Sequence, residues 1–288
     1  MVEFDPFNPD SVPKKRTALG RFAHEGVVFH EGREGEPVVC YSGDDAQFEY
    51  IYKFVSKQKY YKATAGGHLL DEGTLYVAKF KEDGTGEWLS LKFGENGLTP
   101  ENGFANQADI LVNTRLAADL VGATKMDRPE WGAIDPATRE VYFTLTNNSN
   151  RGGEGDRGTD AANPRGPNPH GHIIRWAEDG NEPTALSFQW NIFAFAGDTS
   201  GQDDPDSVAA GFDNNGNPLT EDNIFSSPDG LWIDKDSRVW IQMDMSESVM
   251  NTHPVYEMMG NNGMLAANPR TGEIRRFLTG PRGRRLPV

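Results

Sequence analysis

The chain has 288 residues, enough to bury a substantial core in one large domain or two ordinary ones. Its formal net charge of −15 argues against nucleic-acid binding, because contact with a phosphate backbone requires clustered Lys and Arg. The single cysteine, Cys40, excludes an internal disulfide, and no apolar run reaches the ~18 residues of a membrane-spanning helix. The 32 glycines, the 18 prolines and many short alternating runs predict an all-β fold with many turns and little helix.

Residues 1–20 are punctuated by proline and lack the apolar core of a signal peptide, so we expect an irregular, polar N-terminal arm. A first unit follows, from about residue 21 to residue 92. It contains a hairpin headed by His24 and Glu25, a strand over 50–55, and a closing hairpin formed by GTLYVAKF and GTGEWLSL. These segments supply the four strands that a propeller blade requires. Cys40 lies in an apolar run of this unit and is expected to be a buried structural thiol.

Two further units repeat this plan. The second begins at Lys125, and its polar turn leads into a hairpin that ends near Leu145. The third begins at Ser226 with PDGLWIDKDSRVWIQMDM and closes with GMLAANPRTGEIRRFLTG. We therefore predict that residues 21–288 form part of a β-propeller with about three to four blades. Because propellers close with four to eight blades, either more blades lie in the loops or the chain is part of a longer protein.

Three insertions interrupt the units, at about residues 93–120, 149–170 and 198–225. The first carries the one predicted helix, over 109–120. The second is rich in Gly, Asn, Asp, Arg and Pro and has no apolar period. It is predicted to be a long loop, and loops of this length usually have a function or are disordered.

An acid stands at the head of each repeated hairpin: Glu25, Glu130 and Asp229. The intervals between them are 105 and 99 positions. Because equivalent residues of successive blades face one another across a central channel, we expect the three carboxylates to converge at one channel mouth. Converging carboxylates repel each other unless a cation lies between them. Oxygen ligands favour Ca²⁺, with iron or manganese as further candidates.

Arg128 lies two residues before Glu130. A guanidinium beside a cation site can hold the non-bridging oxygens of a phosphate ester, although Arg128 could instead simply pair with Asp127 or Glu130. A second set of polar residues stands at the ends of the second strands. We expect these residues at the opposite mouth, as structural groups or separate Ca²⁺ ligands: Asp44, Asp45, Asn147, Asn148 and Asp244. The pair His170 and His172 has a spacing that can bind metal, but a structural role is the favoured interpretation.

Several longer motifs resemble those of one family: GRFAHEG, GATKMDRPEW, NPRGPNPHGHIIRW and FSSPDGLWID. Over about residues 19–283 the chain resembles the PhoX-type alkaline phosphatases. The resemblance implies a six-bladed β-propeller that is exported through the twin-arginine route, and hence a periplasmic or secreted location. It also implies metal-assisted hydrolysis of phosphate monoesters with Ca²⁺ and Fe³⁺ in the central channel.

The resemblance also implies roles for single residues. Glu25 and Glu130 would be metal ligands, Asp229 would be a calcium ligand, and Arg128 would be the catalytic residue that holds the phosphate. The chain departs from the family in two ways. First, the family's iron-binding cysteine lies upstream of any segment present here, and Cys40 does not match it. Second, family members continue past the GPRG motif into a segment that supplies another glutamate ligand.

We therefore expect a central fragment with an incomplete metal cluster, weak or inactive as a phosphatase unless another chain completes the propeller. Two alternatives remain. PDGLWIDKDSRVWI also resembles the gluconolactonase-like propellers, which are Ca²⁺-dependent hydrolases. The chain could also be a propeller segment that binds a partner without catalysis. Turnover of a phosphate ester, turnover of a lactone, or neither would separate the three interpretations.

Overall fold

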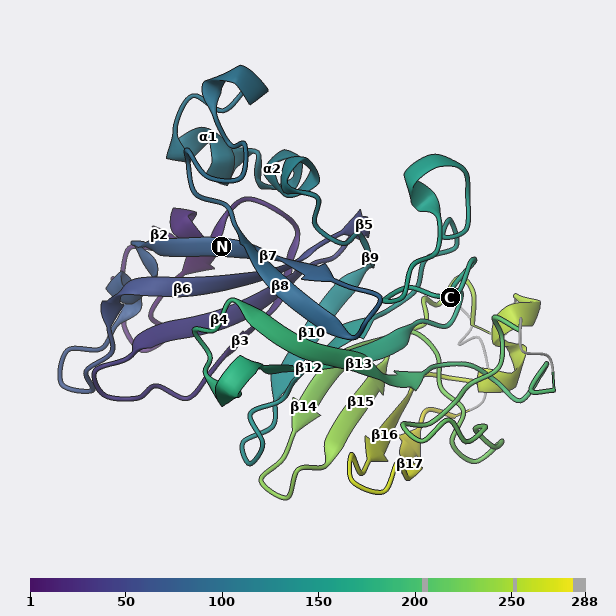
Figure 1. The fold of residues 1–288 in the computed structure, drawn as a ribbon. Helices are drawn as coiled ribbons and strands as arrows, with labels where there is room; N and C mark the ends of the chain where they lie inside the picture. Colours follow the sequence, from purple (N-terminus) through teal and green to yellow (C-terminus); the bar gives the residue numbers. More distant parts are fainter. Residues whose placement is uncertain (204–206, 251–252, 282–288) are drawn as a thin grey trace.

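The structure is a computed structural model, and it describes residues 1–203, 207–250 and 253–281. Most of the regular structure is β, as predicted, and it forms three successive antiparallel units that we call blades (Figure 1). In each blade the strands lie side by side in chain order. The first strand of each blade is called its inner strand below.

The first blade has five strands: β3 (His24–Phe29), β4 (Pro37–Asp44), β6 (Ile51–Lys59), β7 (Gly73–Phe80) and β8 (Thr85–Ser90). The second blade has four: β10 (Pro129–Ile134), β11 (Val141–Leu145), β12 (His172–Glu178) and β13 (Ser187–Phe195). The third has four: β14 (Pro228–Ile233), β15 (Val239–Met243), β16 (Gly263–Ala267) and β17 (Ile274–Thr279). Alternation of apolar and polar residues along these strands buries one face of each against a neighbour.

The inner strands bring the three blades together, because β10 contacts β3 on one side and β14 on the other. The outer strands β8 and β13 also pair over three residues, so the first two blades form one nine-stranded sheet. A core that includes Tyr41 and Trp176 fills the space between the first and second blades. A second core, with Phe193 and Ile241, lies between the second and third blades. Blade-on-blade packing around adjoining inner strands is the arrangement of a propeller.

The predicted helix over 109–120 is two helices, α1 (Gln107–Val112) and α2 (Thr114–Val121). The break is at Asn113, whose φ of −110° and ψ of 45° lie outside the helical region. Asn106 caps α1 by accepting hydrogen bonds from two backbone N–H groups. Buried Ile110 and Ala117 pack the pair onto the first blade, on the side away from the third blade (Figure 1).

The remaining elements are short. The N-terminal arm contains the paired strands β1 (Val2–Glu3) and β2 (Lys14–Lys15), anchored where Arg16 bonds Glu3 and Asp71. Strand β5 (Gln47–Glu49) pairs with β9 (Met126–Asp127). Short 3-10 segments lie at Thr17–Leu19, Gly67–Leu70, Pro100–Asn102, Gly155–Arg157, Asp179–Asn181 and Pro254–Met259. Among the described residues, no helix is long and apolar enough to cross a membrane.

Cys40 is buried in β4, as predicted, and burial raises the pKa of its thiol to about 12. Because the thiolate is the reactive form, we expect Cys40 to remain unmodified by a thiol reagent such as DTNB near neutral pH while the chain is folded. Full reaction of one thiol is expected in denaturant. Rapid labelling of the folded chain would contradict this assignment.

Candidate functional site

Glu130 and Asp229 occupy the same position in their strands, within a β-bulge near the start of each inner strand. The register of β10 against β11 shifts by one residue between Pro129 and Gly132, and β14 shows the same shift around Asp229. Each acid is therefore the first of two bulged residues that oppose a single partner residue. A bulge bends its strand and redirects the side chains at that point.

Glu25 lies one residue before the bulge of its strand, whereas Glu130 and Asp229 lie within theirs. The register shift in β3 begins after Glu25, so Gly26 takes the bulge position that Glu130 has in β10. A Cβ at Gly26 would lie 3.1 Å from the Cα of Trp131, so a larger residue here would press on β10. The predicted equivalence therefore holds for Glu130 and Asp229, but Glu25 is displaced by one residue.

Arg128 extends its guanidinium into the group of acids. Its Nη2 lies 2.7 Å from Glu130 Oε1 and 2.9 Å from Asp45 Oδ1, and its Nη1 donates to Asn147 Oδ1 at 3.4 Å. The backbone of Arg128 has a φ of 56°, in the left-handed region that a non-glycine residue adopts at an energetic cost. Ser227, which has the equivalent place before Asp229, shares this conformation with a φ of 48°. The second and third blades therefore have the same backbone conformation two residues before the acid.

The carboxylates interact unfavourably with one another. Burial and then the charge of Asp229 raise the pKa of Glu130 to about 9, against an ordinary 4.5. Burial also raises the pKa of Asp229 and of Glu25, and the neighbouring charge of Asp45 raises both further. Burial lowers the pKa of Arg128, but its hydrogen bond to Asp45 and the nearby carboxylates outweigh this, so its pKa is raised overall. The three predicted acids are therefore electrostatic neighbours around one guanidinium.

The donor set fits a cation in its chemistry. Asp229 Oδ1 is buried and has no hydrogen-bond partner. Burial, and then repulsion from neighbouring carboxylates, raises the pKa of both Glu130 and Asp229. Carboxylate oxygens are also the ligands that Ca²⁺ prefers. Nevertheless, no group of three His, Cys, Asp or Glu side chains within the described residues is arranged to hold a metal ion. The acids fit a cation, but they do not form a complete cage around one.

The residues at the ends of the second strands do not lie at the opposite mouth, and this prediction is wrong. In an antiparallel hairpin, the end of the second strand lies beside the start of the first, as His24 opposite Asp44 illustrates. Asp45 and Asn147 therefore contact Arg128. Asp244 raises the pKa of Asp229. The same hairpin geometry would have identified Asp45 from the sequence.

Two of these residues do have structural roles. Asp44 is fully buried, accepts a hydrogen bond from the backbone N–H of Ala23, and pairs with Arg115. Asn148 is also fully buried and donates to Asp127 at 2.9 Å. Asp127 in turn pairs with Arg151 rather than with Arg128.

His170 and His172 are both fully buried, and burial lowers the pKa of each to about 4. His172 uses both ring nitrogens inside the protein, at 3.0 Å from Asn168 Nδ2 and 2.8 Å from the carbonyl oxygen of Ala162. His170 Nδ1 lies 2.9 Å from Ser226 Oγ. The bonds of His172 support the structural interpretation for that residue, whereas His170 Nε2 is buried without a hydrogen-bond partner.

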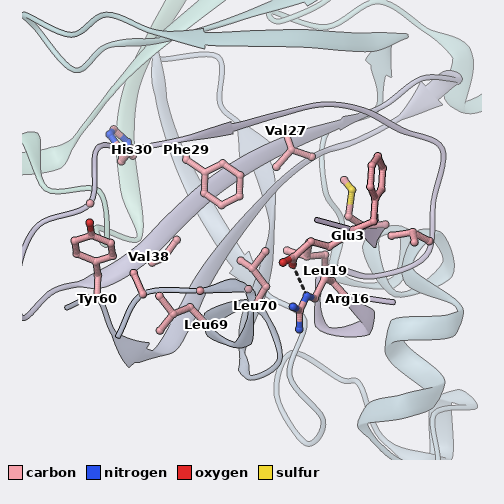
Figure 2. Close-up of a pocket in the computed structure, with 17 residues that line it drawn as sticks. Glu3, Arg16, Leu19, Val27, Phe29, His30, Val38, Tyr60, Leu69 and Leu70 are labelled. Carbon is pink, nitrogen blue, oxygen red and sulfur yellow. Dashed lines mark hydrogen bonds and ion pairs between the residues drawn. The ribbon is translucent and has the colours of Figure 1, made fainter. Parts of the chain in front are cut away.

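An apolar cavity of about 580 Å³ lies apart from these acids, between the N-terminal arm and the first blade (Figure 2). Its lining includes Val27, Phe29, Val38, Leu69 and Leu70. Neither Arg128 nor any of the three predicted acids lines it. The cavity offers no acid cluster, so we place the candidate site at the starts of the inner strands.

Comparison with known proteins identifies the family of the chain. The family model described as alkaline phosphatase PhoX matches residues 1–285. The chain belongs to the PhoX family. A solved structure, Pseudomonas fluorescens PhoX in complex with vanadate, a transition state analogue, is 44% identical and superposes with a TM-score of 0.86. No curated protein matches the chain.

The solved PhoX structure supports the predicted all-β propeller architecture, and it is matched over 97% of this chain. The chain spans about half of that protein, since the match covers 48% of its length. The PhoX fold is therefore represented here by three blades whose inner strands adjoin.

Proposed function

We propose that the chain provides part of a site for hydrolysis of phosphate monoesters, centred on Arg128 and the acids around it. The observation that carries the proposal is the geometry of Arg128. Its strained backbone holds a guanidinium among Glu130, Asp45 and Asn147, at the start of an inner strand. Membership of the PhoX family and the vanadate bound by the solved relative support the same chemistry.

Each residue has a distinct task in this proposal. The planar fork of Arg128 binds non-bridging phosphate oxygens, since two parallel N–H groups match two oxygens. Asp45 and Asn147 contact the Arg128 guanidinium and fix its orientation. Glu25, Glu130 and Asp229 would hold the cations, for which the family resemblance favours Ca²⁺ and Fe³⁺. Bound cations would stabilise charge that develops on the transferring phosphoryl group.

Two further properties belong to the proposal. Because the chain spans about half of the solved relative, we propose that the rest of the ring, from the same polypeptide or from another, supplies the remaining ligands. We also propose a periplasmic or secreted location, on the basis of the family resemblance. Neither property depends on the geometry of Arg128.

The test is hydrolysis of p-nitrophenyl phosphate, with metal content measured on the same sample and with Ca²⁺ and Fe³⁺ added or chelated. Turnover that chelation abolishes and Glu130→Gln reduces is expected. Turnover of a lactone in place of the phosphate ester would favour the gluconolactonase-like alternative. A folded chain that binds Ca²⁺ and vanadate without turnover would indicate a partial site that needs the remaining ligands, whereas binding of neither would contradict the proposal.

The raised pKa of Glu130 predicts how stability depends on pH. Between about pH 4.5 and pH 9 the folded chain retains a proton that the unfolded chain has released, so stability falls as pH rises through this window. We expect the Tm of the cation-free chain to fall between about pH 6 and pH 9. Added Ca²⁺ should raise the Tm more at the higher pH, because it replaces the proton. Glu130→Gln should flatten the profile, and an unchanged profile would show that Glu130 ionises normally.

A further inference from the structure

The relative position of Glu130 and Asp229 depends on a contact between the second and third blades. The acids lie in two different sheets, so no strand pairing fixes one against the other. The backbone carbonyl of Asp229 is instead approached by a side chain from β11. That side chain is Thr144, which is fully buried.

Thr144 touches the bulges of both acids. Its Oγ1 accepts a hydrogen bond from the backbone N–H of Trp131 at 3.0 Å, beside Glu130 in the bulge. The same Oγ1 lies 2.9 Å from the carbonyl oxygen of Asp229 and 3.1 Å from that of Trp131. A hydroxyl has one proton and can donate to one of these carbonyls at a time. One side chain therefore bridges the two bulged segments.

Thr146 makes a similar contact two residues later, directly after the end of β11. It is 1% exposed, and its Oγ1 donates to the carbonyl oxygen of Pro228 at 2.8 Å. Two buried hydroxyls thus connect the second blade to the residues on which Asp229 is mounted.

The junction between the first and second blades is built differently. Ser42 occupies the place in the first blade that Thr144 has in the second, and its Oγ lies 3.0 Å from His24 Nδ1 within its own blade. The blades meet there through backbone, since a Cβ added to Gly43 would lie 2.2 Å from the carbonyl oxygen of Pro129. Hydroxyl bridging is therefore a feature of the junction between Glu130 and Asp229.

We propose that Thr144 and Thr146 are positioning residues that hold the carboxylates of Glu130 and Asp229 in register for joint binding of a cation. The inference rests on the proposed function, because it takes these acids to be cation ligands. The alternative is that the two hydroxyls contribute only to blade packing. The alternatives differ in what happens to cation affinity when the fold is retained.

The test measures Tb³⁺ affinity by luminescence, with Tb³⁺ as a probe for a Ca²⁺ site, together with the Tm of each variant. Thr144→Val keeps the shape of the side chain but removes the hydroxyl, and we expect the Kd for Tb³⁺ to rise about tenfold, the effect of one buried hydrogen bond. Thr144→Ser restores the hydroxyl and should bind Tb³⁺ like the wild type. Thr146→Val should weaken binding in the same direction, and it provides the test if Thr144→Val does not fold.

Thr114→Val is the matched control. Thr114 is fully buried, accepts from the backbone N–H of Arg21 at 3.0 Å and donates to the carbonyl oxygen of Leu111 at 2.9 Å, on α2. This variant should lose Tm without losing Tb³⁺ affinity. If Thr144→Val and Thr146→Val behave like Thr114→Val, the positioning role is overturned while the proposed function stands. If the wild type binds no Tb³⁺, the proposed function fails and the positioning role fails with it.

Discussion

Asp127→Ala is expected to lower the free energy of unfolding by about 3–5 kcal/mol, because it leaves the buried Arg151 guanidinium with only the more distant and partly exposed Asp160, at 3.8 Å, as a counter-charge. Asp127 is fully buried, and its Oδ1 accepts a hydrogen bond from Arg151 Nε at 2.8 Å. Asn148 and Asn168 donate to the same carboxylate, each at 2.9 Å. The carboxylate thus connects the long loop over about residues 149–170 to the start of the second blade, directly beside Arg128.

Urea unfolding measures this loss. Asp236→Ala is the control, because Asp236 lies in an exposed turn and its ion pairs with Lys235 and Arg238 should contribute ~0–1 kcal/mol. The double variant Asp127→Ala with Arg151→Met should recover part of the loss, since it removes the stranded charge as well. If Asp127→Ala alone stays within ~1 kcal/mol of the wild type, the carboxylate does not anchor the loop.

Arg128→Ala is expected to weaken binding of vanadate or phosphate by about 10- to 100-fold, the equivalent of ~1.5–3 kcal/mol for hydrogen bonds to a charged group. The fold should be retained, because the guanidinium is partly exposed and lies at the end of the blade. Calorimetric titration with vanadate, with Ca²⁺ present, measures the effect. Arg128→Lys should restore charge but little affinity, since an ammonium cannot provide the planar fork.

The control for Arg128 is Arg238→Ala. Arg238 also bonds two acids, Asp234 and Asp236, but it lies in the hairpin turn at the far end of β14. Its removal should leave vanadate affinity unchanged. Equal affinities for the wild type and Arg128→Ala would remove Arg128 from the binding site.

The sequence predicts the strands of each blade well, because each hairpin is determined by residues that are close together in the chain. Alternating apolar residues and a short polar turn determine the hairpin from β14 to β15, whatever surrounds it. The same local reasoning misjudged the helix over 109–120, because one residue, Asn113, leaves the helical region and divides it. Burial of Cys40 was predictable for the same reason as the strands, from its apolar neighbours.

The site was predicted only in part. The repeat placed Glu130 and Asp229 at one strand position, but a one-residue difference in the bulge of β3 displaced Glu25, and spacing alone does not reveal bulges. The prediction for Asp45 is wrong because the second strand of an antiparallel hairpin ends beside the start of the first. Nothing in the sequence indicates Thr144, because its contacts depend on how two separate sheets meet.

The most direct test of the account is a crystal structure of the chain grown with Tb³⁺ and vanadate, using the anomalous signal of terbium to locate the ion. The account predicts a terbium peak bound by carboxylate oxygens of Glu130 and Asp229, at ~2.3–2.6 Å, with vanadate held by the Arg128 guanidinium. Terbium bound elsewhere on the acidic surface, with Arg128 still paired to Glu130 and Asp45 and no vanadate beside it, would contradict the account.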